Sequence, residues 1–175
     1  MSVSLQLVEY GVPEAVAKSV RKKLGHGTEG VVYELSRDRI LKVNFTAPKT
    51  FPLTKVYNKV RNKPWAAAMG AHGRLKGRGF WYIAPKLYPI PSHLQSMLDD
   101  LGMTNIRATR GTITKARQKQ LDEIVFARMP PELSRIVKQA RRAGYRDLHG
   151  ANVMRTKTGA LKFIDVESIQ RGRVR

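Results

Sequence analysis

The sequence contains no cysteine and no long hydrophobic run. The absence of cysteine excludes disulfides and thiolate metal sites, and it is typical of cytosolic proteins. No stretch reaches the roughly 18 consecutive apolar residues that a membrane-spanning helix needs. The N-terminal segment also lacks the basic and apolar regions of a signal peptide. We therefore expect a cytoplasmic protein that has no membrane partner.

Acidic residues are scarce as well. The chain has 13 Asp and Glu against 33 Lys and Arg, which gives a formal net charge of +20 at pH 7, and no acidic residue lies between Arg39 and Leu98. A surface of one sign attracts polyanions over a Debye length of roughly 8 Å at physiological salt. We therefore expect an acidic protein or nucleoprotein partner, or nucleic acid bound through residues 49–78 and the C-terminal arginines.

What remains is the composition of one globular domain. The chain has 175 residues, of which 42% are hydrophobic and 26% charged, and this length suits a single domain spanning residues 1–175. Apolar spacing predicts helices over residues 13–23, 52–62, 92–101, 114–121 and 131–143. Short β-like runs predict strands over residues 31–35, 39–45, 80–83, 86–90 and 123–128. Glycine or polar content predicts loops over residues 70–79 and 103–113, with Gly102 ending a helix.

A glycine-rich stretch precedes the hairpin expected from strands 31–35 and 39–45. Its spacing, G-x-G-x-x-G, is formed by Gly25, Gly27 and Gly30 and leads into a strand rather than a helix. A dinucleotide-binding fingerprint needs a helix after the glycines, whereas a glycine-rich flap between antiparallel strands lets backbone N–H groups approach phosphates. Taken alone, the motif fits a plain glycine turn equally well.

Lys42 stands among apolar neighbours in the second strand of this hairpin. Burying an ammonium group is costly unless an anion compensates it. The strand lysine therefore predicts an anion close to its side chain.

Three polar residues near the C-terminus are typical of a cation site. Asp147 and Asn152 are five residues apart in a loop that follows a helix, and Asp165 ends a short apolar strand. Their oxygens are ligands that Mg2+ prefers, and a cation that bridges phosphates neutralises the charge that develops in phosphoryl transfer. The alternative interpretation is two hairpin turns capped by Asp and Asn side chains.

Together and in this order, the glycine loop, strand lysine, Asp-x-x-x-x-Asn loop and strand-end Asp resemble the protein-kinase-like superfamily. The Asp-Leu-His-Gly-Ala-Asn segment is similar to that of aminoglycoside phosphotransferases and other atypical kinases. The size and motif series resemble the kinase domain of early serine/threonine kinases of T7-like bacteriophages, which would place the protein in the host cytoplasm. The resemblance covers residues 24–45 and 124–169.

The resemblance implies an α+β fold of two abbreviated lobes. Residues 1–128 would form the N-lobe, with an antiparallel sheet, helices and a basic insertion. Residues 129–175 would form a truncated, mainly helical C-lobe that carries a catalytic-loop hairpin.

The resemblance also implies ATP and Mg2+ as cofactors, and a role for each motif. The three glycines would cover the phosphates, and Lys42 would pair with the α and β phosphates. Asp147 would orient or deprotonate the acceptor hydroxyl, while Asn152 and Asp165 would hold Mg2+. The strand over residues 123–128 would lead into a hinge whose main chain, from Ala127 to Met129, meets the adenine.

Three departures from the family pattern leave the function open. Tyr145 stands where many members have histidine, and Val166-Glu167 replaces the usual Phe-Gly. The acid-free block offers no glutamate for Lys42, so the candidate counter-ions are Asp165, Asp99, Asp100 and Glu123. Only ten residues follow Asp165, so we expect no activation segment and no peptide-docking platform.

Three hypotheses follow. The chain is a compact serine/threonine kinase that acts on an acidic partner or on itself, a pseudokinase that binds and inhibits an acidic host protein, or a nucleic-acid-binding domain on a kinase-like scaffold. Aminoglycoside modification is disfavoured, because a cationic drug would be repelled by a charge of +20.

Overall fold

The computed structural model describes residues 2–145 and 147–165 and divides the chain into two compact units. The first unit comprises Met1–Asn62 and Ala67–Lys86, and the second comprises Lys63–Ala66 and Leu87–Arg175. The short segment Lys63–Ala66 belongs to the second unit because the Trp65 carbonyl accepts from the Phe163 N–H at 2.8 Å. Within the described residues, no helix is long and apolar enough to cross a membrane.

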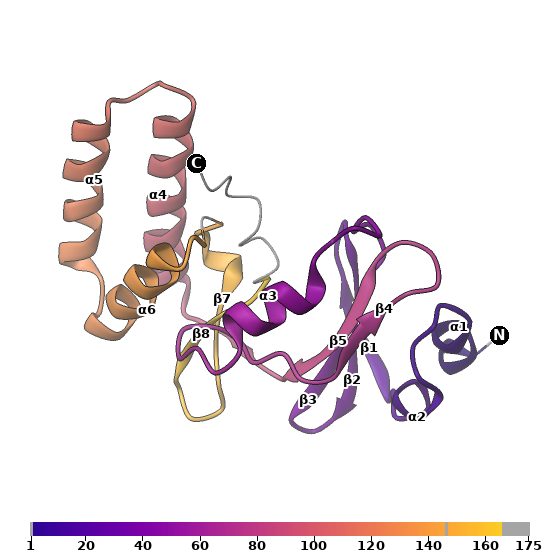
Figure 1. Cartoon of the computed structure of the whole chain (residues 1–175). Coiled ribbons are helices and arrows are strands. Elements are labelled where there is room, and N and C mark those ends of the chain that lie inside the picture. Colours follow the sequence, from indigo (N-terminus) through magenta and orange to yellow (C-terminus); the bar gives the residue numbers. More distant parts are fainter. Residues whose placement is uncertain (1, 146, 166–175) are drawn as a thin grey trace. The chain divides into compact units, whose positions relative to one another are not determined.

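The first unit is built on a five-stranded antiparallel sheet with the strand order β1-β2-β3-β5-β4 (Figure 1). The strands are β1 (Lys22–His26), β2 (Gly30–Ser36), β3 (Arg39–Asn44), β4 (His72–Arg74) and β5 (Phe80–Pro85). The expected hairpin is confirmed as β2 and β3, and the strand expected over residues 80–83 is β5. The α+β class with an antiparallel N-terminal sheet is therefore confirmed.

Helices cover both faces of this sheet (Figure 1). On one face, α1 (Val3–Glu9) and α2 (Glu14–Lys18) pack over Leu41, Val43 and Trp81 in an apolar core. Because side chains alternate along a strand, Lys42 faces the opposite way. On that opposite face lies α3 (Leu53–Val60), the helix expected over residues 52–62.

Two sequence expectations for the first unit are corrected. The helix expected over residues 13–23 ends at Lys18, because the Arg21 N–H donates to the Glu34 carbonyl at 2.8 Å and the chain joins the sheet as β1. The loop expected over residues 70–79 contains β4, which pairs with β5 from His72 to Arg74. In both places, pairing with a neighbouring strand overrides the local pattern.

The second unit combines three helices with a three-stranded antiparallel sheet, ordered β6-β7-β8. Its elements are β6 (Tyr88–Pro89), α4 (Ser92–Thr109), α5 (Lys115–Arg128), α6 (Pro131–Arg142), the 3-10 turn η1 (Gly150–Asn152), β7 (Val153–Arg155) and β8 (Leu161–Phe163). The helix expected over residues 131–143 is confirmed as α6, and its apolar stripe is buried as expected, at Leu133, Ile136, Val137 and Ala140.

Two expectations for the second unit are wrong. Helix α4 continues through Gly102 to Thr109, so most of residues 103–113 are helical rather than a loop. The strand expected over residues 123–128 is the last part of α5. The Thr114 hydroxyl caps α5 by accepting from the Arg117 N–H at 3.1 Å, and the helical hydrogen bonds continue to the Met129 N–H. Helices α4 and α5 thus lie in the second unit, whereas the sequence interpretation counted them with the N-lobe.

Candidate functional site

The glycine-rich stretch forms a tight connection between β1 and β2. Its turn is closed by the Gly27 N–H, which donates to the Gly30 carbonyl at 2.9 Å. A Cβ atom at Gly25 or Gly27 would have no atom within 4 Å, whereas a Cβ at Gly30 would collide with the Val43 carbonyl. Gly30 is therefore required by packing, and the other two glycines leave space around the backbone. The strand–glycine–strand order expected of a flap is present.

A polar brace that sequence reasoning missed holds the base of this flap. Asn44, which is 2% exposed, donates through Nδ2 to Glu29 Oε2 at 3.2 Å. The Glu29 carbonyl also accepts from the Phe45 N–H at 2.9 Å, and Asn44 Oδ1 accepts from the Ala47 N–H at 2.9 Å. An asparagine that ends an apolar strand was the available signal, because a buried amide must be hydrogen-bonded.

Lys42 lies in β3, which has a strand on each side. Its direct neighbours are Val32 of β2 and Tyr82 of β5. The side chain is half-buried, and its Nζ lies 5.9 Å from the centroid of the Tyr82 ring, within the range of a cation–π contact. Helix α3 carries no acidic residue, as the sequence indicated.

The loop that follows α6 begins with a buried tyrosine. Tyr145 is fully buried, and its ring packs against Phe163 with centroids 5.0 Å apart. Its hydroxyl donates to the Ile164 carbonyl at 3.0 Å. The residue that departs from the family pattern therefore ties the Asp147 loop to the residue just before Asp165.

Asn152 connects the same two segments. Its Nδ2 donates to the Asp147 carbonyl at 3.1 Å, and its own carbonyl accepts from the Ile164 N–H at 2.8 Å. The side chain is 3% exposed. Asp165 follows with a φ of 53°, in the left-handed region. The structure thus brings Asp147, Asn152 and the chain entering Asp165 into one hydrogen-bonded cluster.

The Asp147 carboxylate is accessible. Its side chain is 48% exposed, and Oδ1 lies 3.5 Å from Nε2 of His149, which restrains its orientation. An exposed carboxylate can be reached by an incoming group, which a general base needs.

The donor set fits a magnesium ion. Among the described residues, no three His, Cys, Asp or Glu side chains cluster to form a metal site. Mg2+ does not need such a cluster, because it is held by one or two protein oxygens, by waters and by substrate phosphates. The amide of Asn152 and the carboxylate of Asp165 would supply those protein oxygens.

Helix α4 supports the loop through backbone contacts that the sequence did not predict. Asp99 Oδ1 accepts from the Gly150 N–H at 2.7 Å. A Cβ at Gly102 would collide with the Leu148 carbonyl, and a Cβ at Gly150 would lie 2.5 Å from Gln95 Cβ. The glycines therefore allow helix and loop to touch. The signal in the sequence was the spacing of Asp99 and Gly102, which share one helical face.

The adenine contact expected from Ala127 to Met129 depended on a strand that the structure replaces with a helix. Ala127 lies in the last turn of α5. The Met129 N–H already donates to the Val125 carbonyl at 3.1 Å, and Met129 is 6% exposed. The chain instead passes from the first unit to the second between Lys86 and Leu87.

Lys86 is firmly anchored where the chain leaves the first unit. Its N–H donates to the Asp38 carbonyl at 2.8 Å, and its Nζ contacts Glu34 Oε1 at 2.6 Å. The hydrogen bond from Lys86, together with the charges of Lys86 and Lys22, lowers the pKa of Glu34. This anchor fixes the start of the connection.

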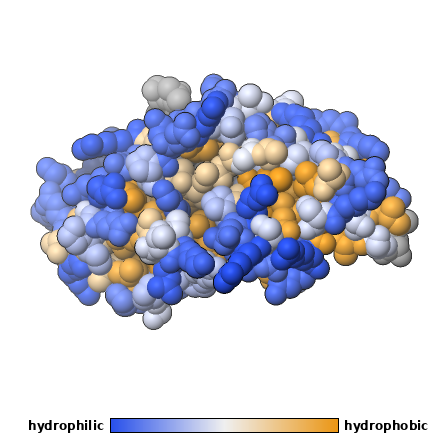
Figure 2. All heavy atoms as spheres, turned by 90° about the horizontal axis from the view of Figure 1, so that it is seen from below, coloured by the Kyte–Doolittle hydropathy of each residue, from blue (hydrophilic) through white to orange (hydrophobic). Residues whose placement is uncertain are grey.

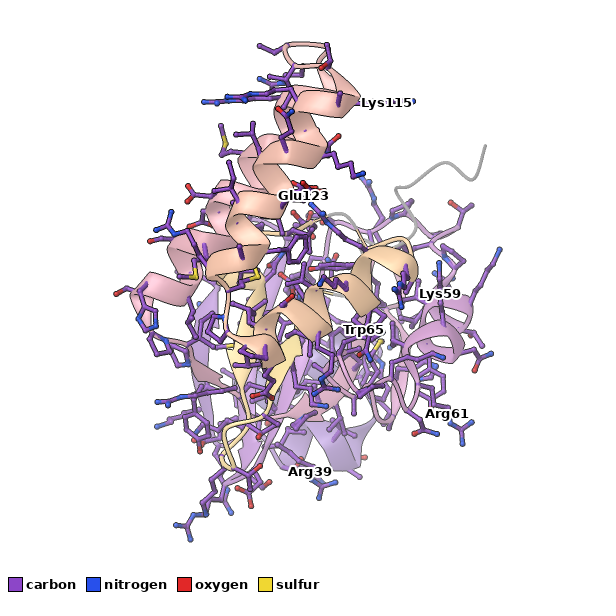
Figure 3. All side chains as sticks on the ribbon, turned by 90° about the vertical axis from the view of Figure 1, so that its left-hand side faces the viewer. Arg39, Lys59, Arg61, Trp65, Lys115 and Glu123 are labelled. Carbon is purple, nitrogen blue, oxygen red and sulfur yellow. The ribbon has the colours of Figure 1, made fainter. Side chains whose placement is uncertain are left out.

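Two of the proposed counter-ions of Lys42 have other contacts in the second unit. Asp99 binds Gly150, and Glu123 lies 3.9 Å from Lys119 on α5 (Figure 3). Asp100 and Asp165 also have interactions of their own.

Both units carry basic side chains on their surfaces. Lys59 and Arg61 extend outward around the end of α3 (Figure 3), within the segment 49–78 expected to bind anions. Hydrophilic residues dominate much of the face in Figure 2. The C-terminal arginines and Val166-Glu167 lie outside the described residues.

Comparison with known proteins gives a likeness in structure alone. No protein-family profile matches the chain, and no curated protein is detectably similar to it. Solved structures that resemble it include two crystal structures of the PknI kinase domain of Mycobacterium tuberculosis, one of them of a mutant, with TM-scores of 0.46 and 0.45. Both are 18% identical to this chain and cover 85% of it, while it spans 58% of their length. At this similarity, function has to be argued from the chain's own residues.

Proposed function

We propose that the protein is an ATP- and Mg2+-dependent phosphotransferase that acts on serine or threonine hydroxyls of an acidic macromolecular partner, or on its own. The observation that carries this proposal is the cluster in which Asn152 bonds both Asp147 and Ile164, the residue before Asp165. In this proposal Asp147 would be the proton acceptor and Asn152 and Asp165 the metal ligands, and the cluster supports it because phosphoryl transfer depends on positioned groups.

The first unit is proposed to hold the nucleotide's phosphates. The backbone of the flap around Gly25 and Gly27 would approach them, because a Cβ atom at either position meets no atom within 4 Å. The Lys42 ammonium would pair with the α and β phosphates. Main-chain groups of the connection at Lys86 and Leu87 replace Ala127 to Met129 as the proposed adenine contact.

The second unit is proposed to carry out the chemistry. The acceptor oxygen attacks the γ-phosphorus, the bond to the ADP oxygen breaks, and the hydroxyl proton passes to the Asp147 carboxylate. His149 and the Asn152 amide keep Asp147 in place. Mg2+ held by Asn152 and Asp165 would neutralise charge on the phosphates as it develops.

An inactive binding module is the second candidate, and one observation favours it. Helix α3 carries no acidic residue that could pair with Lys42 in the usual manner of kinases. In this hypothesis the protein binds an acidic host protein without transferring phosphate. Its effects would then persist when Asp147 is substituted.

Transfer of label from γ-labelled ATP separates the two candidates. The full chain would be incubated with Mg2+, alone and with an acidic protein such as casein, as wild type, Asp147→Ala and Asp165→Ala. Loss of a general base costs about 100- to 10,000-fold, so we expect labelling to fall at least about 100-fold in Asp147→Ala. Glu123→Ala removes an exposed carboxylate from α5 and is the matched control.

Circular dichroism would establish that the variants remain folded. Equal labelling by wild type and both Asp variants contradicts the proposal. If the wild type binds ATP but never transfers label, the inactive module is favoured instead.

A further inference from the structure

The outward face of α6 forms a basic hollow that has no part in the proposed chemistry. Its opposite face is buried in the second unit. The hollow has a volume of about 410 Å3 and is lined by Pro131, Ser134, Arg135, Lys138, Gln139 and Arg142. We call it the α6 hollow. Figure 3 shows α6 with its side chains beside α5.

Three exposed cations of the α6 hollow lie along one helical face. Arg135, Lys138 and Arg142 are spaced by three and four residues, so they line a strip about 10 Å long. Within the described part of the chain, no carboxylate lies at ion-pair distance from these three side chains. By contrast, Arg141 pairs with Asp122 at 2.7 Å.

Neighbouring contacts help to hold the strip in place. Lys138 Nζ lies 5.1 Å from the centroid of the Phe126 ring, which restrains a side chain that is otherwise mobile. The nearest acid in sequence, Glu132, accepts from the Leu161 N–H at 3.4 Å. The positive charges therefore face solvent without local neutralisation.

The α6 hollow also contains a buried acceptor. Gln139 Oε1 is inaccessible to solvent and has no hydrogen-bond partner among the described residues. A buried amide oxygen without a donor is unfavourable, so a rotation of the Gln139 side chain that turns Oε1 into the hollow would let a ligand N–H group satisfy it. A polypeptide offers both carboxylates and backbone N–H groups, whereas the backbone of a nucleic acid offers acceptors only.

We propose that the α6 hollow docks an acidic polypeptide segment of the protein's partner. Carboxylates would pair with Arg135, Lys138 and Arg142, and a main-chain N–H would donate to Gln139. Three or four extended residues, each about 3.4 Å long, match the strip. As a way of recruiting substrate the proposal rests on the proposed phosphotransfer, because α6 leads directly into the loop of Asp147.

Binding of a labelled acidic peptide tests this docking apart from catalysis. The probe is a short fluorescein-labelled peptide of alternating glutamate and glycine, which has no hydroxyl to phosphorylate. Fluorescence anisotropy at physiological salt would compare the wild type with the triple variant Arg135→Gln, Lys138→Gln, Arg142→Gln. The matched control, Arg107→Gln, Arg110→Gln, Lys115→Gln, removes the same residue types from the end of α4, the turn after it and the start of α5 in the same unit.

Both triple variants lose three positive charges, so long-range attraction falls equally in the two. We expect the α6 variant to bind the peptide at least about tenfold more weakly, and the control to change less than about twofold. Gln139→Met keeps the size of the side chain and removes the acceptor, and it should weaken peptide binding about threefold. Asp147→Ala should bind the peptide as wild type does.

Other outcomes overturn the docking proposal. Equal losses in the two triple variants would mean that only overall charge attracts the peptide. The proposal is also wrong if the wild type does not bind the peptide. It is equally wrong if the α6 variant loses affinity for a single-stranded oligonucleotide but not for the peptide. Peptide binding requires no transfer of phosphate. The docking proposal is therefore tested independently of the labelling of substrate.

Discussion

Gly25 and Gly27 in the first unit and Gly102 and Gly150 in the second have opposite surroundings. A Cβ atom at either of the first two would meet nothing within 4 Å. At Gly150 it would lie 2.5 Å from Gln95 Cβ, and at Gly102 it would collide with the Leu148 carbonyl. The same residue type thus keeps one loop open and lets another pack tightly.

The difference bears on the role that the proposed function gives to each unit. The flap of the first unit is held at its base by Asn44 and Glu29 and at its turn by the Gly27–Gly30 hydrogen bond, yet open space remains beside its backbone at Gly25 and Gly27. The backbone of the loop in the second unit is held by α4, by Tyr145 and by Asn152, so the groups proposed to react stand on a chain that is fixed before any ligand arrives. Preorganised groups contribute more to catalysis because they need not be ordered during the reaction.

Of the substitutions that test this comparison, alanine at Gly150 should have the largest effect, which is a loss of stability. The new methyl group would push against the backbone of Gln95, which belongs to a helix and has little room to move. Overpacking of this kind costs about 1 to 3 kcal/mol, and occasionally more. We expect Gly150→Ala to lie near the upper end of this range in urea unfolding.

Gly77→Ala is the control, since a Cβ there meets nothing within 4 Å. Equal stability of the two variants would show that α4 does not confine the loop.

Asp99→Ala should come next, because it removes the acceptor of the Gly150 N–H while leaving the reactive groups untouched. A misplaced catalytic group slows the chemical step more than it weakens nucleotide binding. We expect the kcat of phosphotransfer to fall at least about tenfold with the KM for ATP within about twofold. Asp99→Asn keeps an acceptor oxygen and should restore much of the rate. If the kcat of Asp99→Asn were as low as that of Asp99→Ala, the carboxylate would act in another way than through the Gly150 N–H.

These contacts also mark the limit of sequence-based prediction. The β2–β3 hairpin, α3 and α6 follow from local apolar spacing and turns, and so could be predicted. Gly102 was interpreted as a helix stop, whereas its real role is to contact the loop near Leu148. The β-branched and aromatic residues before Met129 favoured a strand, but the helical hydrogen bonds from Thr114 onward prevailed.

In the candidate site, too, some features could be predicted from the sequence and others could not. Residue types and spacing were enough to propose Asp147, Asn152 and Asp165, because metal-ligand chemistry limits which side chains are suitable. The supporting roles of Asp99 and Tyr145 depend on packing between distant segments, which no local pattern contains.

Gly27→Ala should show the opposite balance to Gly150→Ala. Because the site is open and its φ is not in the left-handed region, we expect the free energy of unfolding to change by no more than about 0.5 kcal/mol. Affinity for ATP should fall severalfold, since a methyl group would stand where phosphates approach the backbone. Urea unfolding and isothermal calorimetry measure the two effects. A large loss of stability without change in ATP affinity would contradict the role given to the flap.

The smallest expected effect concerns Glu34, which lies in the first unit. Lys86 holds the Glu34 pKa below its ordinary value, so the carboxylate stabilises the folded state above the unfolded-state pKa. This stabilisation is lost as the pH falls through the lower, folded-state pKa. Thermal unfolding from pH 7 to pH 3 should therefore show a larger decrease in Tm for wild type than for Glu34→Gln. Parallel curves would mean that the contact with Lys86 contributes nothing to stability.

The central claim is that Lys42 and Asp165 take part in binding magnesium–ATP, and affinity for a non-hydrolysable ATP analogue tests it most directly. We predict that Lys42→Met and Asp165→Asn each lower this affinity at least about tenfold in the presence of Mg2+. When EDTA replaces Mg2+, the effect of Asp165→Asn should disappear and that of Lys42→Met should remain. Binding that is equal in wild type and in both variants would contradict the account.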